Sequence, residues 1–131
     1  MTNQREHALL SASSAHRWLV CPPSAVAAEG YAATTSEFAA EGTLAHSVAE
    51  TYATNAHLCK LPMAELESDK DIPQEMRDHA QAYADYIAEQ KKSDNAVVLL
   101  EQRVDFSPWV PNGFGTCDCI IIQGNTLTII D

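Results

Sequence analysis

The amino-acid sequence predicts an α+β fold, in which N-terminal helices pack on a small antiparallel β-sheet. Helical spacing of apolar residues dominates the chain up to about residue 92, and β-branched segments follow from about residue 96. The last two of these segments flank Gly124-Asn125, the composition of a two-residue hairpin turn. An order in which helices come first and three antiparallel strands follow is typical of an α+β fold. The length of 131 residues fits a single small domain, residues 1–131.

Two short helices are expected at the start of the chain. Serines precede the segment from Ser13 to Val20 and two prolines follow it, which suits the capping and the termination of a helix. The helical spacing of its apolar residues places Trp18 in the core. A second short helix should begin near Pro23, whose fixed φ suits a first turn, and stop before Gly30.

A longer helix is predicted from Ser36 to His57. Gly42 lies inside it, where a glycine costs about 1 kcal/mol relative to alanine. This position indicates the close approach of another backbone or of a ligand, or a kink. Gly42, His46 and Glu50 follow one another at intervals of four, so they share one helical face. The apolar face of the same helix is formed by Phe38, Leu44, Val48, Ala49 and Tyr52.

After a polar linker, Lys60 to Ile72, the segment from Pro73 to Lys92 is amphipathic and predicts a helix. Its apolar stripe, expected in the core, is Met76, Ala80, Tyr83 and Ile87. The segment from Ala96 to Phe106 is β-branched and then alternating, which predicts the first strand.

The terminal hairpin brings two acids together. With Gly124-Asn125 as the loop, Ile122 pairs with Leu127, Ile120 with Ile129, and Asp118 with Asp131. Both acids then close an apolar strip formed by these residues, at the mouth of a core. Like charges directly opposite each other are destabilising unless something offsets the repulsion.

A divalent cation is the simplest group that makes such a pair favourable. The alternative is a different register, in which Asp118 and Asp131 are solvated turn residues. A slip by one residue would move the two acids to opposite faces of the hairpin. The hairpin by itself leaves both interpretations open.

Composition limits the class of protein. No run of about 18 apolar residues and no signal peptide is present, so a cytoplasmic protein without a membrane span is expected. The net charge of −10 argues against a broad basic surface for nucleic acid, but not against phosphate binding through metal ions. The four cysteines fit neither a disulfide framework nor a zinc site and are expected to be reduced: they are Cys21, Cys59, Cys117 and Cys119.

Four segments of the sequence carry motifs, and they are Leu10 to Pro22, Glu41 to His46, Gly113 to Asp118, and Ile129 to Asp131. Taken in order, they resemble the RecB-like branch of the PD-(D/E)XK nuclease superfamily. Within this branch the chain is most similar to a phage and prophage family, the domain of unknown function numbered 2800. The resemblance covers essentially the whole chain, and each motif alone is weak.

The resemblance implies a site. Gly42 and His46 match the G-x-x-x-H helix of the branch, Gly115 and Asp118 match its G-x-x-D, and Asp131 matches the acid of its D-x-K. It follows by analogy that His46, Asp118 and Asp131 bind Mg²⁺ or Mn²⁺, with Asp118 and Asp131 as the catalytic acids.

The implied function is a metal-dependent DNA nuclease that hydrolyses phosphodiester bonds, as an exonuclease or a recombination-associated enzyme. DNA is the implied partner, with other phage recombination proteins as further candidates. The chain stops at Asp131, before the D-x-K lysine. It is therefore expected to be the N-terminal part of the nuclease domain, with an incomplete restriction-endonuclease-like core, and to be inactive as a fragment.

Other interpretations stay open. The chain could be a non-catalytic phage module that keeps the fold for DNA binding or assembly, or an ordinary interaction domain whose acids are incidental. Cys21 lies where some relatives place the first of four iron–sulfur cysteines, but the other three positions are not matched, so a buried structural cysteine is expected and a cluster is not. Glu101 is an outside candidate for the site, and Glu50 a candidate support for His46 or a bound ion.

Overall fold

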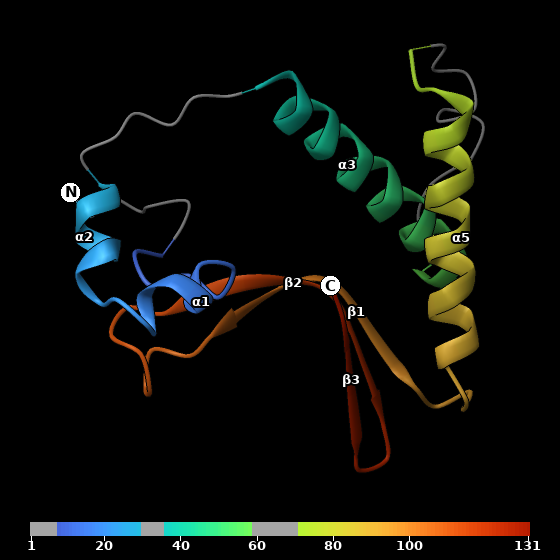
Figure 1. Ribbon diagram of the computed structural model, residues 1–131. Helices are drawn as coiled ribbons and strands as arrows, with labels where there is room; N and C mark the ends of the chain where they lie inside the picture. The colour runs from blue at the N-terminus through green and yellow to red at the C-terminus, as the bar shows by residue number, and fades with distance from the viewer. Residues whose placement is uncertain (1–7, 30–35, 59–70) are drawn as a thin grey trace, which may run out of the picture. The chain divides into compact units, whose positions relative to one another are not determined.

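The computed structural model describes residues 8–29, 36–58 and 71–131 (Figure 1). Within these ranges the chain has an α+β fold, as predicted, with four helices followed by one three-stranded sheet in the order β1-β2-β3. The helices are α1 (Ala15–Trp18), α2 (Pro23–Ala28), α3 (Glu37–Leu58) and α5 (Gln74–Gln90), and the strands are β1 (Val97–Asp105), β2 (Phe114–Gln123) and β3 (Thr126–Ile130).

The predicted helices and the first predicted strand match the observed ones within two residues at each end. Helix α1 is nevertheless much shorter than predicted. It has only four residues, and Trp18 is half-buried instead of belonging to the core. Its indole Nε1 donates a hydrogen bond of 2.8 Å to the backbone oxygen of Ser11. The predicted linker between the two long helices lies almost entirely outside the described residues, as does Cys59. Within the described ranges, no helix is long and apolar enough to cross a bilayer.

The chain divides into two compact units, residues 1–34 with 102–117 and residues 35–101 with 118–131. In the first unit, β1 and β2 are joined by the loop of residues 106–113. The backbone N–H of Phe106 donates to the oxygen of Gly113 at 3.0 Å. A Cβ on Gly113 would lie only 2.5 Å from the Phe106 ring, so this position needs glycine.

The second unit contains the core residues that support the candidate site. Helix α3 begins after Ser36, whose hydroxyl oxygen accepts a hydrogen bond of 3.1 Å from the backbone N–H of Ala39. Helices α3 and α5 lie side by side (Figure 1). The small residues Ala80 and Ala84 of α5 let the two helices approach closely, and Val48 and Tyr52 of α3 pack in the same buried cluster.

A second buried cluster joins these helices to the sheet. Ala53 of α3, Ile87 of α5 and the β2 residues Cys119 and Ile121 are all fully buried within it. Leu100 and Ile130 pack against its edge. The α5 stripe predicted from the sequence therefore does face the core, as Ala80 and Ile87 show.

The hairpin has the predicted register. Ile122 pairs with Leu127, Ile120 with Ile129 and Cys119 with Ile130, and Gly124 has the positive φ of 56° that the turn was expected to need. Continued by one residue, this register sets Asp118 opposite Asp131.

The acids were predicted to close an apolar strip at the mouth of a core, but most of this strip does not face the core. Ile120 is buried, but Leu127 and Ile129 are 59% and 60% exposed. The sheet packs on the helices through the alternate face, which carries Cys119 and Ile121. Hairpin register fixes which residues share a face, but the face that packs on the helices is decided by contacts with α3 and α5.

Candidate metal centre

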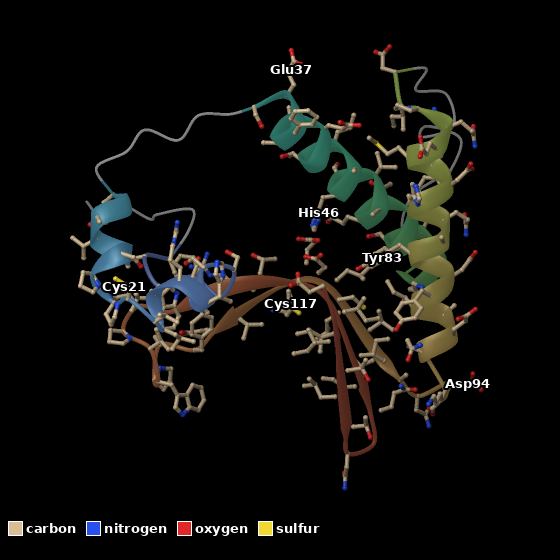
Figure 2. The ribbon with its side chains drawn as sticks, in the orientation of Figure 1. Cys21, Glu37, His46, Tyr83, Asp94 and Cys117 are labelled. Carbon is tan, nitrogen blue, oxygen red and sulfur yellow. The ribbon has the colours of Figure 1, made fainter. Side chains whose placement is uncertain are left out.

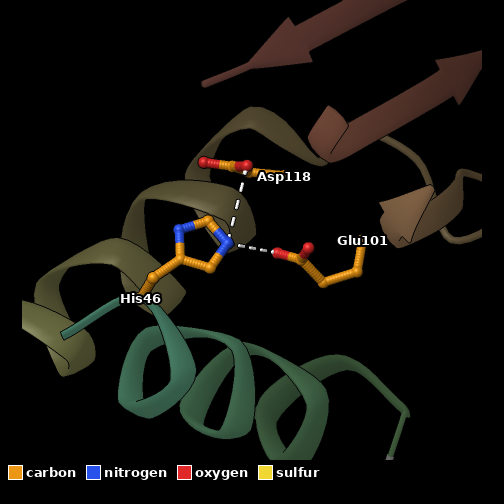
Figure 3. Close-up of side chains that lie close together, drawn as sticks. All are labelled: His46, Glu101 and Asp118. Carbon is orange, nitrogen blue, oxygen red and sulfur yellow. Dashed lines mark hydrogen bonds and ion pairs between the residues drawn. The ribbon is translucent and has the colours of Figure 1, made fainter. Parts of the chain in front are cut away.

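Three side chains from three elements converge in the second unit. The ring atom Nε2 of His46 on α3 lies 2.7 Å from Oε1 of Glu101 on β1 and 3.7 Å from Oδ1 of Asp118 on β2 (Figure 3). One donor atom from each residue lies within 4.8 Å of the donors of the other two. Imidazole nitrogen and carboxylate oxygen are ligands that divalent cations such as Mn²⁺ accept.

The approach of Glu101 to His46 depends on an irregular point in β1. Glu101 has a φ of 47°, in the left-handed region. In a regular strand Leu100 and Glu101 would point to opposite faces, yet both line the same cavity. The left-handed residue breaks the alternation, so that Leu100 contacts the core while Glu101 reaches the imidazole. Such backbone strain in a non-glycine residue is typical of functional sites.

The strain at Glu101 predicts that a glycine variant is more stable than an alanine variant at this position, the reverse of the usual order in a strand. Glu101→Gly should be more stable than Glu101→Ala by about 1 kcal/mol, because glycine adopts a positive φ without the Cβ penalty. Urea unfolding of the two variants measures the difference. In a regular part of β1 the order should be reversed, and the pair Gln102→Gly and Gln102→Ala provides this control. A Glu101→Ala variant that is the more stable of the two would contradict the left-handed conformation.

The remaining predicted residues lie around this cluster. Asp131 lines the same cavity as His46 and Asp118, and its charge raises the pKa of Asp118, but it is not part of the three-residue cluster. Glu50, one turn after His46, lines the cavity and helps to raise the pKa of His46. A Cβ on Gly42 would meet no described heavy atom within 4 Å, so no described backbone or side chain approaches it.

The cluster has an excess of negative charge. Burial raises the pKa of Asp118, His46 opposes this shift, and the charges of Asp131 and Glu101 add to it. For His46, burial alone would lower the pKa, but the hydrogen bond to Glu101 and the charges of the nearby acids together raise it. A divalent cation would relieve both effects, because it supplies the positive charge that the acids lack.

The raised pKa values predict that the ion-free protein loses stability as the pH rises. Protonated His46 stabilises the fold below the ordinary histidine pKa of about 6.5, and this contribution is lost as the pH rises through the raised value. Asp118 acts in the same direction from about pH 4 upward, since its ionised form is disfavoured in the fold. The histidine effect is small, because its side chain is 47% exposed.

Thermal unfolding in a chelator at about pH 6 and about pH 8 measures the histidine effect. His46→Gln should reduce the difference between the two midpoints, and the exposed His16→Gln should leave it unchanged. Equal pH dependence in wild type and His46→Gln would contradict the assignment.

The other candidate ligands are not part of this cluster. Cys21 is exposed at the start of the second helix, so the prediction that it is buried is wrong (Figure 2). Among the described residues, Cys21, Cys117 and Cys119 form no disulfide. His57 is hydrogen-bonded through Nε2 to the backbone oxygen of Ala84 at 3.0 Å, and His79 lies 3.9 Å from Glu75 within α5.

Sequence reasoning gave too little weight to Glu101. Its alternation with Arg103 and Asp105 is typical of a solvated strand face, and no glycine or asparagine marks the left-handed position. A polar residue directly after the apolar run from Val97 to Leu100 was the only available signal.

Comparison with known families gives one assignment. Residues 7–131 match the family described as "Protein of unknown function (DUF2800)". The match spans nearly the whole chain, so the protein belongs to this family, in agreement with the resemblance seen in its motifs. No solved structure matches the chain.

Proposed function

We propose that this chain provides the metal-binding part of a DNA nuclease of the PD-(D/E)XK superfamily, in its RecB-like branch, acting in phages or prophages. The observation that carries the proposal is the meeting of His46 with Asp118, at 3.7 Å, between a helix and a strand that are far apart in the sequence. A helix packed beside an antiparallel meander also supports a restriction-endonuclease-like core.

In the proposed site, His46, Asp118 and Asp131 hold Mg²⁺ or Mn²⁺, and Glu101 is added to them because of its distance to His46. The imidazole must be neutral to offer Nε2, so ion binding would displace the proton shared with Glu101. When bound, the ion would lower the pKa of a water molecule and offset the charge that develops on the scissile phosphate. Asp131, opposite Asp118, would add a second carboxylate on the strand side.

The charge of the protein makes an ion necessary for DNA binding in this proposal. The net charge is −10, and none of the described residues that line the cavity is Lys or Arg. A phosphate would be repelled from the cavity unless a cation lies between it and the acids. We therefore expect DNA binding that depends on a divalent ion.

Fluorescence anisotropy of a labelled oligonucleotide tests this expectation. Binding should appear with Mn²⁺, disappear with a chelator, and be lost in Asp118→Asn. The same samples, run on a denaturing gel, report cleavage. DNA binding that is equally strong with and without the ion, or absent in both conditions, would contradict the proposal.

A non-catalytic DNA-binding or assembly module is the second candidate. The net charge of −10 favours this module over the enzyme, because it disfavours the approach of a scissile phosphate. Ion-dependent DNA binding without cleavage would favour this module over the enzyme.

A further inference from the structure

A cavity of about 770 Å³ opens beside the candidate metal centre, and both polar and apolar residues line it. His46, Glu101, Asp118 and Asp131 line part of it, together with the acids Glu41, Glu50 and Glu75 and with His79. Apolar side chains from the two long helices and the sheet line the remainder, including Phe38, Ala45, Met76, Tyr83 and Leu100. A small-molecule site commonly has this volume and this combination of an apolar wall with a few polar groups.

The lining excludes several kinds of ligand. A free anion is disfavoured by the acids, and a wholly apolar ligand would leave these acids without a cation. A ligand that fits carries one anionic group, which a bound ion can hold, and a flat neutral group, which the apolar wall can cover. A single nucleotide has this composition, with its phosphate at one end and its base at the other.

Three residues of helix α3, about one turn apart on one face, suit the three parts of a nucleotide. His46 is a candidate ligand, Gly42 leaves open space where a side chain would stand, and Phe38 has a ring that is 84% exposed. Successive members of this series are displaced by about 6 Å along the helix axis. Phe38 adds nothing to the described core, but an exposed ring is suited to stacking on a base.

We propose that this cavity binds an unstacked nucleobase, against Phe38, with the sugar over Gly42 and the phosphate at the ion. This inference rests on the proposed nuclease function and adds a substrate class to it. A base inside a duplex is stacked on both faces and cannot enter the cavity. The substrate is therefore single-stranded DNA or an unpaired end, and not the interior of a duplex.

The inference is tested with two small ligands that differ only in the base. Calorimetry of the Mn²⁺-loaded chain compares deoxyadenosine 5′-monophosphate with 2-deoxyribose 5-phosphate. The nucleotide should bind about tenfold more tightly, which is the low end of the range for one stacked base. Equal affinities would overturn the inference and leave the proposed function in place, provided that Mn²⁺ binds.

Substitutions in the cavity test where the base binds. Phe38→Ala should abolish the preference for the nucleotide, whereas Tyr86→Ala, an exposed aromatic residue on α5 outside the cavity lining, should keep it. Gly42→Leu fills the space assigned to the sugar and should weaken the binding of both ligands. Circular dichroism establishes that each variant is folded. A preference that survives in Phe38→Ala, or unchanged binding of both ligands in Gly42→Leu, would overturn the inference.

A separate Mn²⁺ titration distinguishes a failure of the proposed function from a failure of the base-binding inference. If neither Mn²⁺ nor the nucleotide binds the wild-type chain, the proposed function fails and the base site fails with it. If Mn²⁺ binds and single-stranded and duplex oligonucleotides displace the nucleotide equally well, only the substrate class is wrong.

Discussion

Asp118→Asn is expected to lower the affinity for Mn²⁺ by about 100-fold, while the ion-free protein becomes at least as stable as the wild type. The loss of affinity follows from the removal of a charged ligand oxygen at the centre of the cluster, 3.7 Å from His46. The gain in stability follows from the raised pKa of Asp118: burial and the charges of Asp131 and Glu101 disfavour its ionised form in the fold.

Calorimetric titration with Mn²⁺ and thermal unfolding in a chelator measure the two effects. Asp94→Asn is the matched control, because it makes the same change of charge at an exposed position outside the cavity lining (Figure 2). The control should bind Mn²⁺ as the wild type does. Equal, weak binding by wild type and Asp118→Asn would remove the metal site. Lower stability of ion-free Asp118→Asn would show that the carboxylate supports the fold instead of straining it.

Ile121→Ala is expected to destabilise the protein by about 2–5 kcal/mol. Ile121 is fully buried among Ala53, Ile87 and Cys119, so its removal both loses buried apolar surface and leaves a cavity between the helices and the sheet. A loss of this size is comparable with the whole stability of a small domain. The variant should therefore be largely unfolded at 37 °C, or close to its unfolding midpoint at that temperature.

Urea unfolding followed by circular dichroism measures the change. Ile129→Ala removes the same atoms from the same hairpin at a position that is 60% exposed, and should change the free energy of unfolding by less than about 1 kcal/mol. Similar losses in the two variants would mean that the hairpin does not pack on the helices through the Cys119 and Ile121 face.

The features predicted from the sequence differ in the information on which they depend. The apolar stripe of α5 and the register around Gly124 were predicted correctly, since helical spacing and turn chemistry depend on residues that are close in the sequence. Trp18 and Cys21 were placed wrongly, because their burial depends on what packs over a very short helix. The meeting of His46 with Asp118 followed from a resemblance to a family, and not from the periodicity of either segment.

By itself, the sequence determined the long helices, the three strands and the pairing of the hairpin, because each is specified by a local pattern of apolar residues and turn residues. Only the tertiary structure decided which face of the hairpin is buried, and that Glu101, 55 residues from His46, joins the candidate centre. The physical reason is the same in both cases. Burial of a sheet face and a left-handed residue in a strand are set by packing between distant segments, and local propensity carries no record of that packing.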